Sequence, residues 1–222
     1  MELDKAIEQR FSVKSFTRKT VDFGVISKLL DAAIKAPSAG NLQDWRFVVV
    51  TSDSKKLELG KACRDQVWVG QASAVIVVCS DLTDLNRFYN DRAETYGIED
   101  CSAATQNILL KATDLGVNAT WISAFDEDEV SRIIRTPDYF KIVSVVPIGY
   151  SEEKATEKKR NVLNTVTYFD EYGNSTMNPS AFPIVKGENV TAVKEAAKES
   201  KGFFSRIKDK FKDVREEMKK ED

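Results

Sequence analysis

An uninterrupted apolar run, Ala74-Val75-Ile76-Val77-Val78-Cys79, restricts the fold of this chain more than any other segment. The run leaves no polar face for solvent, so as a strand it needs cover on both faces of its sheet. Apolar character predicts further strands over residues 45–51, 118–125 and 142–148. This pattern requires helices on two sides of one sheet.

The spacing of apolar residues predicts helices that can provide this cover. They are expected over residues 2–10, 25–34, about 100–115 and 127–134. The second ends at Ala36-Pro37 and the third at Gly116, a residue suited to a helix C-terminus. Strands that alternate with helices favour a three-layer α/β sandwich. The pairing directions of the strands stay open.

Composition excludes several classes of function. Histidine is absent from the 222 residues, which removes every mechanism that needs an imidazole. The formal charge is −2, so no overall basic field recruits nucleic acid. Cys63, Cys79 and Cys101 form no CxxC pair and predict neither disulfides nor a zinc site, and Cys79 is expected to pack as a small apolar side chain. The chemistry must therefore come from a cofactor, carboxylates or thiols, and no metal site is expected.

The N-terminal residues lack the apolar stretch of a secretory signal. No run approaches the ~20 apolar residues that a membrane-spanning helix needs. These absences predict a soluble, cytoplasmic protein.

Composition changes after Tyr172, which predicts a domain over residues 1–172 and an extension over 173–222. Residues 173–192 are polar and indicate a linker, and a charged helix is expected from about Val193 to Met218. Its apolar residues recur every three or four positions over only two heptads. The pattern favours an amphipathic helix that docks on its own domain or on a dimer partner. A small coiled coil, a partner-binding helix and a membrane-surface helix are the alternatives.

A basic segment near the N-terminus alternates Arg10, Ser12 and Lys14. In an extended backbone these three side chains project to one side. A guanidinium, a hydroxyl and an ammonium that converge there can receive a phosphate or an electron-rich carbonyl edge. The alternative is a basic loop that is only solvated.

The segment from Ala36 to Trp45 combines small residues with the amides of Asn41 and Gln43. Small residues allow close backbone approach, and amides supply donors and acceptors that suit the edge of a heterocycle. The alternative is a plain turn between a helix and a strand.

Two later segments are also candidates for ligand contacts. Ser123 and Ala124 lie where a strand is expected to end, which would leave backbone N–H groups open to a ligand unless the segment is only a strand. Lys158-Lys159-Arg160 is a second basic cluster, which by itself indicates exposed surface.

Together these segments resemble the nitroreductase family of flavin proteins. That family has a basic R-x-S-x-R/K loop, an APSxxNxQ-W-x-F segment, a glycine-led segment with W-i-x-x-f, a p-x-G-Y motif and a K/R-rich turn. This chain carries them in the same order, over Arg10/Ser12/Lys14, residues 36–47, 116–125 and 147–150, and Lys158/Arg160. The resemblance covers about residues 3–170.

The resemblance implies an α+β, FMN-binding α/β/α sandwich with a mixed or antiparallel central sheet. It also implies an intertwined homodimer with two FMN sites at the subunit interface. Arg10, Ser12 and Lys14, with Phe11 between them, would contact the phosphate, ribityl chain and pyrimidine edge, and Ser123 and Ala124 would present N–H groups to the flavin N5/O4 edge. The remaining implied contacts are Pro37, Ser38, Ala39, Asn41 and Gln43, partly from the other subunit, Gln66, and Lys158 and Arg160 at the phosphate.

The implied activity is that of an FMN-dependent oxidoreductase. NADH or NADPH would reduce the flavin, which then reduces a nitroaromatic, a quinone or a similar acceptor in a ping-pong cycle. The flavin carries the chemistry, so no catalytic side chain is expected. No GxGxxG motif is present, which makes the nicotinamide nucleotide a co-substrate. The alternatives are a flavin-binding or regulatory protein whose C-terminal helix docks a partner, and another flavin chemistry such as reductive dehalogenation or flavin fragmentation.

Two residues near the expected flavin depart from the family pattern. Phe11 stands where a second basic residue is frequent, and Asp44 stands where proline is common between Gln and Trp. The loss of one cation would weaken phosphate binding only modestly, so FMN is still expected. Asp44 is expected to alter the loop at the mouth of the pocket.

Overall fold

The computed structural model describes residues 1–156 and 158–174. The chain divides into two units, Met1–Thr156 and Glu157–Asp222. The described residues of the second unit contain a short 3₁₀ helix, η4 (Leu163–Thr165). The helix expected over residues 193–218 lies outside the described residues, and the domain boundary predicted after Tyr172 stays a prediction.

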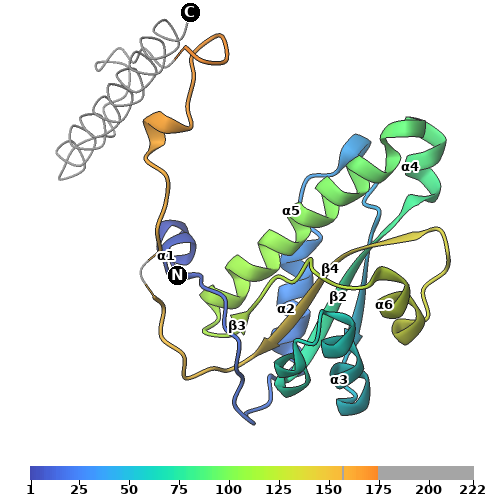
Figure 1. Ribbon diagram of the computed structural model, residues 1–222, viewed down its shortest axis with the longest axis vertical. Helices are drawn as coiled ribbons and strands as arrows, with labels where there is room; N and C mark the ends of the chain where they lie inside the picture. The colour runs from blue at the N-terminus through green and yellow to red at the C-terminus, as the bar shows by residue number, and fades with distance from the viewer. Residues whose placement is uncertain (157, 175–222) are drawn as a thin grey trace, which may run out of the picture. The chain divides into compact units, whose positions relative to one another are not determined.

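A four-stranded antiparallel sheet forms the centre of the first unit (Figure 1). Its strands are β1 (Trp45–Val50), β2 (Ala74–Asp81), β3 (Asn118–Ala119) and β4 (Phe140–Gly149), in the spatial order β1-β2-β4-β3. β2 pairs with β1 on one side and with β4 on the other. The sheet is thus antiparallel, one of the two arrangements that the family resemblance implies.

Helices cover both faces of this sheet, as the apolar run in β2 requires. Side chains at Ala74, Ile76 and Val78 share one core with α2 (Phe23–Ala33) and α5 (Ala93–Asp114). The alternate side chains of β2 share a second core with α3 (Asp53–Ala62) and α6 (Glu127–Ile134). The residues from Val75 to Cys79 are 0% exposed, so the expected three-layer α/β/α sandwich is confirmed.

The remaining elements of the first unit lie at the margins of the sheet. They are α1 (Leu3–Gln9), α4 (Leu82–Tyr89), and the 3₁₀ helices η1 (Ala39–Asn41), η2 (Val67–Gln71) and η3 (Asn90–Arg92). Within the described residues, no helix combines the length and the apolar character needed to cross a bilayer.

Helix boundaries differ from the sequence expectation in two places. α5 begins at Ala93 and not near Asp100, so Gly97 lies inside the helix. Glycine is needed there because the helix comes close to β2. A Cβ at Gly97 would lie 2.3 Å from Ser80 Oγ. α3 was not expected from the sequence, because a lysine such as Lys56 normally indicates an exposed position. In the structure Lys56 is buried, and its Nζ donates to the Ala72 carbonyl at 2.6 Å.

The strand expected over residues 118–125 is wrong in length. β3 pairs with β4 only at Asn118 and Ala119, and a single bridge follows between Ile122 and Val145. The backbone N–H of Thr120 donates to the Pro147 carbonyl at 3.2 Å. Proline has no N–H to return, so the ladder is interrupted there.

The second core predicts a large stability difference between two leucines of α3. Leu59 is 0% exposed and Leu57 is 44% exposed. Leu59→Ala should lower the free energy of unfolding by about 2–5 kcal/mol, because it leaves a cavity between helix and sheet. Leu57→Ala is the matched control and should change it by less than about 1 kcal/mol. Urea titrations of both variants test this, and equal losses would contradict the burial of Leu59.

Candidate functional site

The basic N-terminal segment is held against the residues that follow β3. Val13 is fully buried; its N–H donates to Thr120 Oγ1 at 3.0 Å, and its carbonyl accepts from the same hydroxyl at 2.8 Å. Ser12 and Lys14, on either side of Val13, are exposed, and Arg10 is partly exposed. One threonine therefore fixes the backbone from which three polar side chains extend.

Hydrogen-bond donors are left free on both segments. Among the described residues, the side chains of Arg10, Ser12 and Lys14 form no hydrogen bond or ion pair. In the same part of the chain, the backbone N–H groups of Ser123 and Ala124 have no acceptor, and both residues are exposed. The arrangement can therefore bind an electron-rich, negatively charged molecule.

Glu153 also binds the basic segment through hydrogen bonds. Its Oε1 accepts from the Lys14 N–H at 2.9 Å and from Ser15 Oγ at 2.6 Å. These hydrogen bonds, the Ser15 bond first, lower the pKa of Glu153 from its ordinary value. The Thr17 N–H also donates to the Tyr150 carbonyl at 2.7 Å. The segment after β4 thus orders the loop that carries the cations.

Gln66 lies directly before η2, which is close to the basic N-terminal segment. The rings of Phe16 and Trp68 lie 6.1 Å apart between centroids, which places η2 beside the N-terminal segment. The Gln66 amide donates to the Cys63 carbonyl at 2.8 Å, so its nitrogen is engaged. Phe11 is partly buried next to Arg10.

The second predicted group lies in the loop before β1. Pro37, Ser38, Ala39, Asn41 and Gln43 are all at least partly exposed there. Three backbone positions are left-handed, with φ of 55° at Gly40, 57° at Asn41 and 52° at Gln43. A Cβ at Gly40 would lie 2.5 Å from Tyr89 Oη, so glycine is needed there for space as well as for φ. The loop is tightly wound and presents its amides outward.

A single copy of the chain does not bring the two groups together. The basic segment is tied to Thr120, near the Gly149 end of β4, where Asn118 pairs with Gly149. The loop leads into Trp45, which pairs with Ser80, and Ser80 pairs with Lys141 at the other end of β4. Eight residues of strand separate these ends, a span of about 27 Å. Lys158 and Arg160 belong to the second unit.

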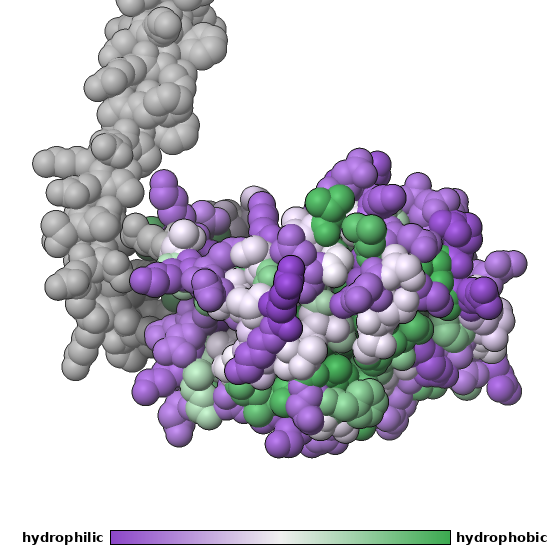
Figure 2. Space-filling view, turned by 90° about the horizontal axis from the view of Figure 1, so that it is seen from below, coloured by the Kyte–Doolittle hydropathy of each residue, from purple (hydrophilic) through white to green (hydrophobic). Residues whose placement is uncertain are grey.

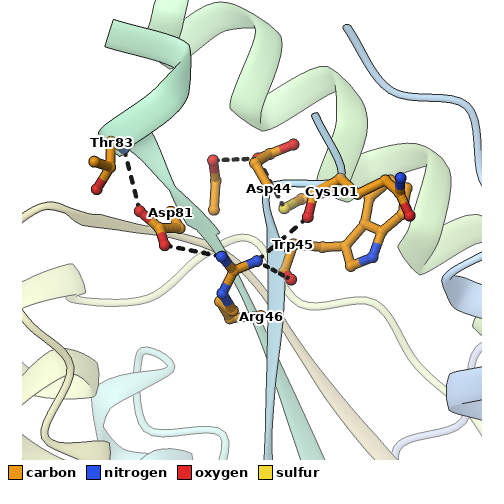
Figure 3. Close-up of polar contacts among 8 residues, drawn as sticks. Asp44, Trp45, Arg46, Asp81, Thr83 and Cys101 are labelled. Carbon is orange, nitrogen blue, oxygen red and sulfur yellow. Dashed lines mark hydrogen bonds and ion pairs between the residues drawn. The ribbon is translucent and has the colours of Figure 1, made fainter. Parts of the chain in front are cut away.

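Asp44 lies in the interior at the end of this loop, and its expected effect on the loop at the pocket mouth stays a prediction (Figure 3). It is 4% exposed, and its Oδ2 accepts a hydrogen bond from Ser80 Oγ. Its Oδ1 is buried without a partner among the described residues. The side chain therefore turns away from the loop surface and toward β2 and α5.

The three cysteines are poor candidates for thiol chemistry. All are fully buried, as expected for Cys79. Burial raises the pKa of the Cys63 and Cys79 thiols to about 12. The Cys101 pKa is raised as well, by burial first and then by the nearby Asp44. Reactive thiolates are therefore disfavoured at all three positions.

Three positioning residues were not expected from the sequence. They are Thr120, Glu153 and Asp100, whose carboxylate accepts from the Ala39 N–H at 2.9 and 3.0 Å. Each is separated from its partner by more than 60 residues, so no local pattern reveals it. Thr120 directly precedes Trp121 and Glu153 lies shortly after Gly149-Tyr150, so their closeness to these motifs was a signal for those two residues. Asp100 had no such signal.

Comparison with known proteins gives a consistent family. A family model described as "Nitroreductase family" matches residues 7–94 and 66–150. A protein of Archaeoglobus fulgidus, provisionally named NADH dehydrogenase/NAD(P)H nitroreductase, is 34% identical over 68% of this chain and 86% of its own length. A Methanothermobacter thermautotrophicus protein with the same name is 32% identical over 69% of this chain and 79% of its own length. A solved structure from Bacteroides thetaiotaomicron, provisionally titled likewise, is 29% identical, covers 77% of this chain and 98% of its own, and has a TM-score of 0.68.

Thr120→Val should loosen the basic segment, because valine keeps the shape of threonine and removes both hydrogen bonds to Val13. The buried N–H and carbonyl of Val13 would be left unpaired, so the free energy of unfolding should fall by about 1–3 kcal/mol. Hydrogen exchange of residues 10–16 should become faster. Thr120→Ser keeps the hydroxyl and should preserve slow exchange. Equal exchange in the two variants would show that the hydroxyl does not hold the segment.

Proposed function

Since this chain is an oxidoreductase that belongs to the nitroreductase family, we propose that it binds FMN and passes electrons from NADH or NADPH to a nitroaromatic, quinone or similar small acceptor. The observation that carries this proposal is the pair of hydrogen bonds between Val13 and Thr120. They tie the segment that carries Arg10, Ser12 and Lys14 to Thr120, which precedes Ser123 and Ala124 in the chain. The A. fulgidus relative, whose name includes NAD(P)H nitroreductase, supports the choice of reductant.

The free donors match the chemical groups of FMN. Its phosphate is a dianion that suits Arg10, and its ring edge carries acceptors that suit the Lys14 ammonium and backbone N–H groups. The Ser12 hydroxyl adds a neutral donor between the two cations. We assign further phosphate contacts to Lys158 and Arg160. The donor set thus fits the cofactor.

When bound, FMN supplies the hydride chemistry that no side chain of this chain offers. Arg10 would neutralise the phosphate, and Lys14 would place a positive charge at the pyrimidine edge. The N–H groups of Ser123 and Ala124 would orient the ring edge and stabilise negative charge on it. Both residues are exposed, so solvent reaches this edge and can deliver protons. The buried cysteines have no part in the reaction.

We also propose that a second copy of the chain completes each site. The two groups of predicted residues lie at opposite ends of the sheet in one protomer, so a partner has to supply the loop with Asn41 and Gln43. Apolar side chains are exposed on the first two helices: Leu3 is 65%, Ile7 53% and Phe23 72% exposed. Figure 2 shows apolar surface among the hydrophilic residues of one face. Such surface is typical of an obligate dimer.

Two coarser assignments belong to the same proposal. Residues 1–172 form the flavin-binding domain, and residues 173–222 form an accessory extension. We place the protein in the cytoplasm, where the reduced nicotinamide nucleotides that it would consume are available.

An absorbance spectrum of the purified protein before and after anaerobic NADH or NADPH tests the function directly. Two flavin bands that bleach with either nucleotide are expected. Bands that do not bleach would favour the flavin-binding or regulatory alternative. A variant that lacks residues 185–222 would then test that alternative, because it should keep flavin binding and lose the capture of a partner. A colourless protein that also fails to take up FMN would overturn the proposal.

Arg10→Ala and Lys14→Ala should each weaken FMN binding by about 1–3 kcal/mol, the size of a charge-assisted hydrogen bond. Quenching of flavin fluorescence measures the dissociation constant. Arg18→Ala is the matched control, because Arg18 is an exposed cation of the same segment outside the predicted set. An equal loss in all three variants would indicate nonspecific charge attraction and not a site.

Complementation between two defective variants tests the shared site. Lys14→Ala and Asn41→Ala, each purified alone, should have low activity. Co-expressed and reassorted at random, they should recover about a quarter of wild-type activity, since half of the dimers carry one intact site. Recovery would fail if each protomer built its sites from its own residues.

A further inference from the structure

Asp44 and Asp100 are two buried carboxyl groups to which the proposed reaction gives no role. They are 4% and 6% exposed. Among the described residues, neither forms an ion pair with a cation. An unpaired buried charge is unfavourable, and a second one beside it is more so, because the two repel.

The two carboxyl groups are neighbours: Cys101 Sγ lies 4.0 Å from Asp44 Oδ2, Cys101 directly follows Asp100 on α5, and Asp44 helps to raise the pKa of Asp100. Carboxylates are only acceptors, so a hydrogen bond between the two requires a proton on one of the pair. Asp44 Oδ2 already accepts from Ser80 Oγ, and its buried Oδ1 lacks any other donor among the described residues. Both oxygens of Asp100 accept from the Ala39 N–H, at 3.0 and 2.9 Å. A shared proton is the missing donor of this cluster.

Arg46, which follows Trp45 directly after Asp44, is directed elsewhere, as Figure 3 shows. The guanidinium of Arg46 in β1 binds the Asp81 carboxylate at 3.0 Å. It also donates to the carbonyls of Gln43 at 3.3 Å and Trp45 at 3.0 Å. Arg46 therefore pairs with β2 and the backbone, and it does not neutralise Asp44.

The other titratable groups around the pair add no positive charge. Glu99 on α5 contributes a negative charge, and the Cys79 and Cys101 thiols from β2 and α5 are held neutral by burial. Burial first, then the hydrogen bond with Asp44, raise the pKa of Asp100 to about 7, while the Ala39 N–H opposes the shift. The surroundings thus favour one retained proton.

The pair joins the two ends of the loop that would line the flavin. Asp100 holds the loop at Ala39, and Asp44 is the residue that directly follows Gln43. Asn41 and Gln43 have left-handed backbones that are unfavourable for non-glycine residues, so the loop depends on such anchors.

We propose that Asp44 and Asp100 share one proton, and that this proton holds residues 38–43 in the conformation that lines the flavin. Without it, two adjacent carboxylates repel and drive the ends of the loop apart. The proton itself rests on contacts within this chain, and the link to flavin rests on the proposed function.

The direction of the pH dependence follows from the raised pKa. Between about pH 4 and pH 7 the folded chain holds a proton that the unfolded chain has lost, so stability falls as pH rises through this window. Above about pH 7 the contribution is gone. If FMN binding stabilises the proton by one pKa unit, FMN affinity should fall about tenfold between pH 6 and pH 8.5.

Asp44→Asn and Asp100→Asn each replace the shared proton by an amide donor. We expect the wild type to lose thermal stability from pH 5 to pH 8 and both variants to have flatter profiles. The infrared band of a protonated carboxyl should be present in the wild type at pH 6, vanish near pH 8 and be missing from both variants. FMN affinity in Asp44→Asn should be independent of pH. Asp84→Asn, an exposed acid on α4, is the control and should follow the wild type.

Each outcome decides one part of the proposal. Absence of the carboxyl band in the wild type would overturn the shared proton, even if both variants fail to fold. A band that titrates while FMN affinity stays constant would overturn the link to the loop. If the wild type binds no FMN at any pH, the proposed function fails and its flavin link with it, while the band and the stability profile still decide the proton.

Discussion

Burial of β2 on both faces is the constraint on which the rest of the first unit depends. Because its side chains alternate between two cores, α2 and α5 must cover one face while α3 and α6 cover the other. The faces of the sheet are then unavailable to a ligand. The segments that carry free polar groups are left at the two ends of the sheet and along the edge beyond β3. The location of the candidate site follows from how the core is covered.

The anchor of the basic segment has a structural origin in β4. Pro147 has no N–H to donate to the neighbouring strand, so β3 ends at Ala119. The residues after β3 pair with β4 again only at Ile122. Beyond that bridge, Ser123 and Ala124 keep unpaired N–H groups. Thr120, within the interruption, uses its hydroxyl to bind Val13. Pro147 therefore accounts for the interruption in which Thr120 anchors the basic segment, whereas the unpaired amides of Ser123 and Ala124 lie beyond the restored pairing at Ile122.

Asp44 shows how a departure from the family pattern can change what lies beneath a site. A proline between Gln43 and Trp45 would carry no charge, whereas Asp44 brings a carboxylate to Ser80 and Asp100. The anchoring of the loop by these two residues would therefore depend on pH, although the surface of the loop keeps the residues typical of the family. The functional consequence lies in the anchoring of the loop and not in the contacts it presents.

By itself, the sequence determined the sandwich and the order of the motifs, because the run at 74–79 and the helical spacings are local patterns of burial. The antiparallel or mixed sheet was implied only by the family resemblance that those motifs carry. Tertiary structure decided what depends on distant partners. It shortened the strand after Asn118 through Pro147, buried Lys56 in an unexpected helix, and turned Asp44 inward toward Asp100. It also set the two groups of predicted flavin residues at opposite ends of the sheet, because pairing register has no signal in a single strand.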